Sequence, residues 1–156
     1  MQNITFEICD FTNPLHQQAL TSLLNHYMSD PMGDYPQHDE KKQAKLLEGL
    51  GSHPSAFVLF LLYDGEYAGM TTNFVNYSTF KLKPYLYIHD VVILAKYRGL
   101  GLGKAMMEKL VLISKERDYC KITLEVREDN PAALSLYKNL GFEECDPKMY
   151  FWTKTL

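Results

Sequence analysis

Apolar and polar positions follow strand-like patterns in the first half of the chain. Residues 4–8 alternate between apolar and polar side chains, which predicts a strand with one buried face. Residues 56–63 are almost wholly apolar and predict a buried strand. Asp64 and Gly65 favour a tight turn, so residues 66–77 are expected to return as the second strand of a hairpin.

Helical periodicity follows the first strand. Asn13 and Pro14 suit the cap and the first position of a helix. Four residues give that helix an apolar face: Leu20, Leu23, Leu24 and Tyr27. Shorter helices are predicted over residues 41–50 and 131–140.

A strand, a helix and a second strand succeed one another later in the chain. The first strand ends at Ile93, and the helix after it has an apolar stripe made by Leu102, Met106, Leu110 and Ile113. Residues 121–126 form the next strand, and this order implies a parallel pair. A final strand is predicted over residues 149–153. The pattern predicts an α/β fold with a mixed, mostly antiparallel central sheet, flanking helices and a single domain over residues 1–156.

Composition narrows the class of protein. Hydrophobic residues make up 46% and charged residues 22%, as in a soluble globular domain. A net charge of −3 does not favour nucleic-acid binding, and no apolar run is long enough for a membrane span. The segment from Met1 to Glu7 lacks the pattern of a signal peptide. Three cysteines without CxxC spacing predict a reduced, cytoplasmic protein, and the histidines show no metal-ligand spacing, so no metal is expected.

A glycine-rich segment joins the strand ending at Ile93 to its helix. Gly99, Gly101 and Gly103 clear side chains from this segment, so its backbone can approach a ligand closely. The first N–H groups of a helix have no intrahelical acceptor and carry partial positive charge, which suits a phosphate. Arg98 and Lys104 add a positive charge at either end. We call residues 98–104 the glycine loop, and it predicts a pyrophosphate site.

Two familiar phosphate-binding motifs fit the glycine loop poorly. A Walker loop needs Ser or Thr after its Gly-Lys pair, whereas Ala105 follows Lys104. A dinucleotide fingerprint reads Gly-x-Gly-x-x-Gly, whereas this loop reads Gly-x-Gly-x-Gly. Glu125 lies roughly where a ribose-binding acid would be expected. A nucleotide-binding enzyme therefore stays an alternative, as does a glycine-rich turn with no ligand.

The spacing Arg98-x-x-Gly101-x-Gly103 resembles the acyl-CoA loop of the GNAT superfamily of N-acetyltransferases. Residues 130–142 are similar to a second signature of that family, an Asn, a helix carrying a Tyr, and then Gly-Phe. Here these residues are Asn130, Tyr137, Gly141 and Phe142. The two signatures occur in the order found in the family, whereas the first half of the chain matches only in outline.

The resemblance implies a splayed parallel strand pair, as in the acyl-CoA N-acyltransferase fold, and acetyl-CoA as cosubstrate. The pyrophosphate would be held by Arg98, Gly99, Leu100, Gly101, Leu102, Gly103 and Lys104. The pantetheine arm would lie along the strand edge at Val91, Val92 and Ile93. The family has a bulge at this edge, which the sequence does not reveal. Asn130, Ala133 and Tyr137 would contact the CoA from the late helix.

Two residues are candidates for proton transfer when an amine attacks the thioester. The resemblance implies that Tyr137 protonates the departing thiolate, although its helical spacing also fits a core aromatic. His89 is the candidate base because imidazole titrates near neutral pH. Related sequences often have glutamate there, and a hydrogen-bonded strand histidine is the alternative. Strand alternation puts Tyr87 and His89 on one face and Asp90 on the other, where a structural role is expected.

The acceptor is expected to be a primary amine on a small molecule or a peptide. In the family the first two helices usually help to form the acceptor site. Acids and aromatics that attract a cationic amine lie between those helices here: Tyr27, Asp30, Asp34, Tyr35, Asp39 and Glu40. A solvated polar loop would have the same composition.

The predicted function is transfer of an acetyl group from acetyl-CoA to an amine by direct attack. A non-catalytic acyl-CoA-binding module is the alternative. The family also suggests a homodimer formed through late strands, and residues 149–152 are apolar enough to take part. Closure of the core by that segment would explain the same composition.

Overall fold

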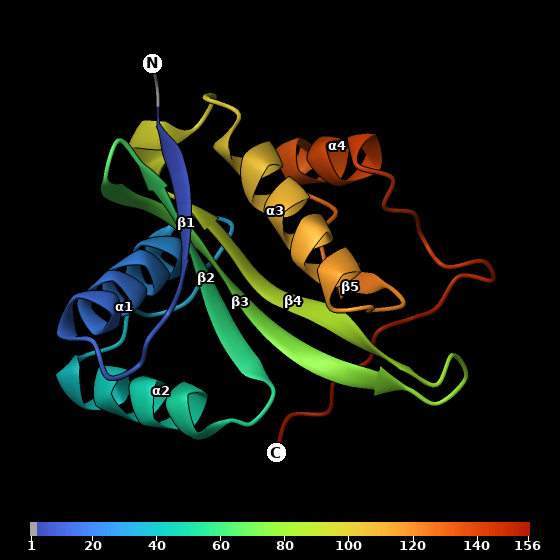
Figure 1. Ribbon diagram of the computed structural model, residues 1–156, viewed down its shortest axis with the longest axis horizontal. Helices are drawn as coiled ribbons and strands as arrows, with labels where there is room; N and C mark the ends of the chain where they lie inside the picture. Colours follow the sequence, from blue (N-terminus) through green and yellow to red (C-terminus); the bar gives the residue numbers. More distant parts are fainter. Residues whose placement is uncertain (1–2) are drawn as a thin grey trace. The chain divides into compact units, whose positions relative to one another are not determined.

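The computed structural model describes residues 3–156 and contains a five-stranded mixed sheet (Figure 1). Met1 and Gln2 lie outside the described residues. They begin the segment from Met1 to Glu7 in which the sequence shows no signal-peptide pattern. The strands are β1 (Ile4–Ile8), β2 (Ala56–Tyr63), β3 (Glu66–Ser78), β4 (Lys83–Ile93) and β5 (Ile122–Leu124), in that order across the sheet. Neighbours from β1 to β4 are antiparallel, and β4 and β5 are parallel. The predicted fold class is confirmed.

Three of the four α-helices in residues 3–156 begin after a residue whose side chain caps the first turn. The helices are α1 (Pro14–Ser29), α2 (Glu40–Ser52), α3 (Leu102–Glu116), α4 (Pro131–Asn139) and a short 3-10 turn, η1 (Ala95–Tyr97). The side chain of Asn13 accepts a hydrogen bond from the Leu15 N–H at 2.9 Å at the start of α1. Asp39 caps α2 through the Lys42 N–H at 2.9 Å, which satisfies a donor that the helix leaves unpaired.

The chain divides into two compact units between Glu125 and Val126. The first unit contains the sheet with α1, α2 and α3, and the second contains α4 and the C-terminal segment. A single domain over the whole chain stays a prediction.

The first unit buries apolar side chains on both faces of its sheet. On one face, Leu20 and Leu23 of α1 join a cluster with Phe60, Met70 and Val92. Helix α3 buries Leu102, Met106, Met107 and Leu110, and it lies across the sheet from α1 and α2 (Figure 1). Complete burial of such a side chain contributes about 1.5–3 kcal/mol, so this core fixes β4 between two helical layers.

A bulge interrupts the pairing of β3 and β4. Thr72 lies opposite Asp90, but its neighbour Asn73 lies opposite Ile88, so His89 is the additional residue. Tyr87 lies opposite Phe74, which is two residues from Thr72 on β3. Tyr87 and Asp90 therefore share a face of the sheet. The prediction that Asp90 faces away from Tyr87 is wrong, because the bulge shifts the alternation by one residue.

The end of the chain also differs from expectation. The predicted strand over residues 149–153 is wrong, since residues 142–156 contain neither strand nor helix. A strand needs a hydrogen-bonded neighbour, and the second unit contains no other strand. Strand β5 is also shorter than the expected residues 121–126.

Candidate functional site

The glycine loop has a backbone that only glycine adopts readily. Gly99 and Gly101 have φ angles of 80° and 77°, in the left-handed region. Gly101 caps α3, and its carbonyl oxygen accepts the first hydrogen bond of the helix from the Ala105 N–H at 3.1 Å. The N–H groups of residues 102–104 precede that bond and lie at the positive end of the helix dipole. This geometry suits an anion.

The side chains of the glycine loop differ in their burial. Leu102 is buried and anchors the start of α3 in the core, whereas Leu100 is exposed. The Lys104 amino group is exposed and lies 3.7 Å from a carboxylate oxygen of Glu108, one helical turn away. Neither Gly99 nor Gly101 has a heavy atom within 4 Å of the position that a Cβ would take, so space beside the loop is open.

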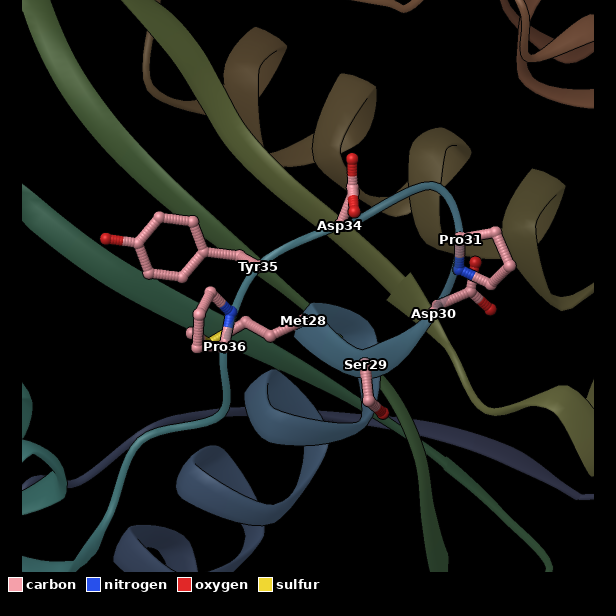
Figure 2. A pocket seen from close by; sticks show the side chains of 7 residues that line it. All are labelled: Met28, Ser29, Asp30, Pro31, Asp34, Tyr35 and Pro36. Carbon is pink, nitrogen blue, oxygen red and sulfur yellow. The ribbon is translucent and has the colours of Figure 1, made fainter.

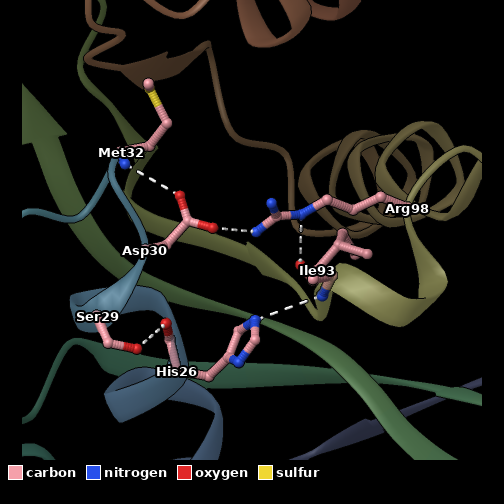
Figure 3. Close-up of polar contacts among 7 residues, drawn as sticks. His26, Ser29, Asp30, Met32, Ile93 and Arg98 are labelled. Carbon is pink, nitrogen blue, oxygen red and sulfur yellow. Dashed lines mark hydrogen bonds and ion pairs between the residues drawn. The ribbon is translucent and has the colours of Figure 1, made fainter.

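Arg98 is held by the end of α1. Its guanidinium donates hydrogen bonds to Asp30 Oδ2 at 2.7 Å and to the Ile93 carbonyl oxygen at 3.2 Å (Figure 3). Asp30 also accepts a hydrogen bond from the Met32 N–H at 3.0 Å. The Met32 bond and then the Arg98 bond hold the pKa of Asp30 below its ordinary value. A contact between Arg98 and a pyrophosphate stays a prediction.

The second half of β4 has an unpaired edge within the described residues. Strand β5 pairs with β4 only as far as Ile88, so Val91, Val92 and Ile93 pair with β3 alone. On the β3 side, Ile93 lies opposite Gly69, where a Cβ would meet the Val92 carbonyl oxygen at 2.5 Å. The parallel pair therefore separates at the bulge and leaves backbone groups of residues 91–93 beside the glycine loop.

The bulge gathers polar and aromatic side chains around His89. Its Nδ1 lies 3.1 Å from Asp90 Oδ2, and its ring contacts those of Phe74 and Tyr87, each with centroids 6.0 Å away. The Tyr87 hydroxyl donates a hydrogen bond of 2.6 Å to Glu125 Oε1. We call these five residues the bulge cluster.

Titration properties differ within the bulge cluster. The hydrogen bond to Asp90 raises the pKa of His89 above its ordinary value, against an opposing effect of partial burial, and the charge of Glu125 adds to the rise. Burial, followed by the hydrogen bond to Glu125, raises the pKa of Tyr87 to about 12. Tyr87 therefore keeps its proton near neutral pH, whereas His89 can gain and lose one.

The end of α1 and the segment after it border an open, shallow pocket of about 370 Å³ (Figure 2). Seven residues line it: Met28, Ser29, Asp30, Pro31, Asp34, Tyr35 and Pro36. Two of the acids expected to attract an amine have structural partners, because Asp30 binds Arg98 and Asp39 caps α2. Asp34 and Tyr35 are the lining residues best placed to meet a ligand, and Tyr35 is exposed.

The second signature forms local structure in the second unit. Asn130 caps α4 by accepting a hydrogen bond from the Ala133 N–H at 3.1 Å. Tyr137 is buried, and its ring lies 5.8 Å from that of Phe142. Contact of Asn130, Ala133 or Tyr137 with CoA stays a prediction.

Three contacts around the site could not be predicted from the sequence. The Arg98–Asp30 pair and the Tyr87–Glu125 hydrogen bond join residues far apart in sequence, for which a single chain gives no signal. His89 and Asp90 are consecutive in the sequence, but regular strand alternation predicts that their side chains point to opposite faces and do not meet.

Residues 3–156 contain neither a candidate metal cluster nor a helix that could span a membrane. Across residues 3–156, no three His, Cys, Asp or Glu side chains gather as a metal site would require. In the same part of the chain, every helix is too short or too polar to cross a membrane.

Comparison with known families identifies this arrangement. The model of the Acetyltransferase (GNAT) family matches residues 20–142, which is more than half of the chain. The chain belongs to the GNAT acetyltransferase family. The match includes β4, the glycine loop and α4, and it extends to the first half of the chain, where sequence reasoning found only an outline.

Individual GNAT relatives differ in what they acetylate. A [ribosomal protein bS18]-alanine N-acetyltransferase from Haemophilus influenzae is 37% identical over 67 residues, covering 43% of this chain and 45% of that protein. The chain thus matches less than half of that relative's length. A thialysine N-epsilon-acetyltransferase from Caenorhabditis elegans is 26% identical over 138 residues, covering 88% of this chain and 82% of that protein.

Solved structures agree with the fold. An aminoglycoside N-acetyltransferase in complex with CoA has a TM-score of 0.76 at 15% identity, covering 100% of this chain and 97% of that one. At that identity the likeness supports the fold and not the substrate.

Proposed function

We propose that this protein transfers an acetyl group from acetyl-CoA to a primary amine, by direct attack of the amine on the thioester. The observation that carries the proposal is the glycine loop at the start of α3, beside the unpaired edge of β4. One segment offers N–H groups to a pyrophosphate, and the other offers backbone groups to an extended arm. CoA contains both a pyrophosphate and an extended pantetheine arm, so the two segments together suit CoA. Membership of the GNAT family supports the same cosubstrate.

Proton transfer falls to His89 and Tyr137 in this proposal. His89 would accept the ammonium proton, directly or through water, because its ring is half exposed and can titrate near neutral pH. Tyr137 would protonate the departing thiolate. Burial raises the pKa of the Cys9 thiol to about 11, so this thiol would be a poor nucleophile.

The amine class is also a proposal. The relatives' names include an alanine of a ribosomal protein, thialysine and aminoglycosides. All three are primary amines that are cationic before reaction, and the acids and aromatics of the bulge cluster and of the pocket would suit such a group.

Thiol release from acetyl-CoA tests the reaction. Three probes represent the three amine classes: thialysine, a peptide beginning with alanine, and kanamycin. We expect at least one probe to release CoA thiol together with an acetylated amine in mass spectrometry. Binding of CoA without release on any probe would favour the non-catalytic module, and a clear preference for NAD or ATP in a thermal scan would favour the nucleotide-binding alternative.

A further inference from the structure

The bulge on β4 allows a contact that a regular strand forbids. Successive side chains of a strand point to opposite faces, so a His and the Asp after it would not meet. At the bulge, His89 has no opposite residue on β3, and its Nδ1 comes within 3.1 Å of Asp90 Oδ2. The Asp90 side chain is 14% exposed and that of His89 is 56% exposed. The carboxylate is thus largely buried beside a ring that is more than half exposed.

We propose that Asp90 is a positioning residue for His89, holding the proton on Nδ1 so that Nε2 presents its lone pair to the acceptor amine. The proposal rests on the proposed function, because it assigns His89 as the base of that reaction. A carboxylate can only accept a hydrogen bond, so its presence at Nδ1 selects the ring tautomer that keeps a proton there. A histidine side chain in water favours the other tautomer, with the proton on Nε2, which could not act as a base at the open edge.

No other group of the described residues competes for this role. On β4, the Tyr87 hydroxyl is occupied by Glu125. From β3, Phe74 offers only its ring, and His53, at the end of α2, contacts the same Phe74 edge-on with centroids 5.1 Å apart. Glu125, just after β5, acts on His89 through its charge, whereas Asp90 has a carboxylate oxygen 3.1 Å from Nδ1. Among the described residues, the titratable groups that contact His89 or act on it are Tyr87, Asp90 and Glu125, and His53 contacts its neighbour Phe74.

The tautomer of His89 is measurable without any substrate. Nitrogen-15 chemical shifts of the ring distinguish the two neutral tautomers, and following them with pH gives the pKa. We expect neutral His89 of the wild-type protein to carry its proton mainly on Nδ1. In Asp90→Asn and Asp90→Ala the population should shift towards Nε2–H, and the His89 pKa should fall, because the interaction that favours the charged ring is lost.

A matched control separates this effect from general loss of negative charge. Asp118→Asn removes an exposed carboxylate whose partner is Lys83, 2.8 Å away, at a φ of 55° that Asn tolerates. This variant should leave the His89 tautomer, the His89 pKa and the turnover unchanged.

Kinetic measurements test whether the positioning of His89 by Asp90 matters for the reaction. With whichever of the three amine probes reacts, Asp90→Asn should lower kcat/KM by about 10- to 100-fold, towards the lower end of the contribution of a general base. The acidic limb of its pH profile, where the rate rises as the base loses its proton, should move to lower pH with the lower pKa of His89, while the affinity for CoA stays unchanged. His89→Gln should lose the rate at least as strongly, and Asp90→Asn should add little in that background, since both act through one ring.

Several results would overturn the proposal. A wild-type ring with its proton on Nε2 would do so without any variant, even if Asp90→Asn failed to fold. An unchanged pH profile in Asp90→Asn, or full activity in His89→Gln, would also do so while leaving acetyl transfer intact. Failure of the proposed function has a different signature, which is wild-type protein that releases no thiol on any probe.

Discussion

Asp30 joins two segments that lie far apart in the sequence. It ends α1, and it binds Arg98 at the entrance of the glycine loop and the Met32 N–H of its own segment. His26 reinforces the junction, because its Nε2 accepts a hydrogen bond from the Ala95 N–H at 3.3 Å (Figure 3). A single carboxylate therefore links the pocket after α1 to the proposed CoA site.

The Asp30–Arg98 pair predicts a pH-dependent stability. Asp30→Asn should lower the free energy of unfolding by about 1 kcal/mol at neutral pH, a modest value because the Arg98 side chain is half exposed. The folded-state pKa of Asp30 is depressed, so its contribution is complete above the unfolded pKa of about 3.9 and disappears as pH falls through the folded value.

Urea unfolding of both proteins at neutral and acidic pH measures this difference. Asp34→Asn is the control, since Asp34 lines the same pocket and has a φ of 47° that Asn tolerates. A constant difference between Asp30→Asn and wild type down to the lowest pH would contradict the assignment.

A second prediction for a single residue concerns the hydroxyl of Tyr137. Tyr137→Phe keeps the ring beside Phe142 and should change stability little. If the hydroxyl protonates the thiolate, the turnover should fall about 10²- to 10⁴-fold with CoA affinity nearly unchanged. Tyr150→Phe, an exposed tyrosine of the same unit, should keep full turnover. Full turnover in Tyr137→Phe would make Tyr137 a core aromatic only.

At the scale of elements, β4 and α3 hold the glycine loop between them in place. Strand β4 ends at Ile93, and the two left-handed glycines bring the chain around to begin α3 at Leu102. The core holds both elements, so the loop between them is fixed at each end. An anion site made of backbone N–H groups requires such support.

The glycine loop can be tested by blocking it. Gly101→Glu would put a carboxylate in the proposed path of the pyrophosphate and should abolish detectable CoA binding in calorimetry. The left-handed φ costs about 1–2 kcal/mol for any L side chain, so the control is Gly65→Glu. Gly65 has a φ of 83° in the β2–β3 turn and nothing near its Cβ position. It should lose similar stability and keep CoA affinity; normal affinity in Gly101→Glu would exclude the loop.

Local signals explain which elements the sequence could predict. The Asp64-Gly65 turn, the Asn13 and Asn130 caps and the strand ending at Ile93 depend on residues within a few positions of one another, and all are present. The bulge at His89 depends on register with β3, and the Arg98–Asp30 pair spans 68 positions. Neither leaves a local pattern, so the acid–imidazole contact of the proposed site could only come from the structure.

At the scale of the whole molecule, the apolar segment near the C-terminus is unexplained by the fold. Met149, Tyr150, Phe151 and Trp152 are 71%, 77%, 77% and 84% exposed. Exposed aromatic residues in succession are typical of an interface. The expected homodimer through late strands would bury them and would supply the neighbour that a strand requires.

The homodimer is tested by light scattering at micromolar concentration. We expect a species of twice the chain mass of 18.0 kDa, because four adjacent apolar side chains lose contact with water when the copies associate. Phe151→Asp should shift the protein towards monomer, since a carboxylate is costly to bury in such a contact. Leu156→Asp is the control, as Leu156 is fully exposed outside the segment. A wild-type protein that stays at 18.0 kDa would rule out the dimer. Closure of the core, the other role expected for residues 149–152, does not fit side chains that are so exposed.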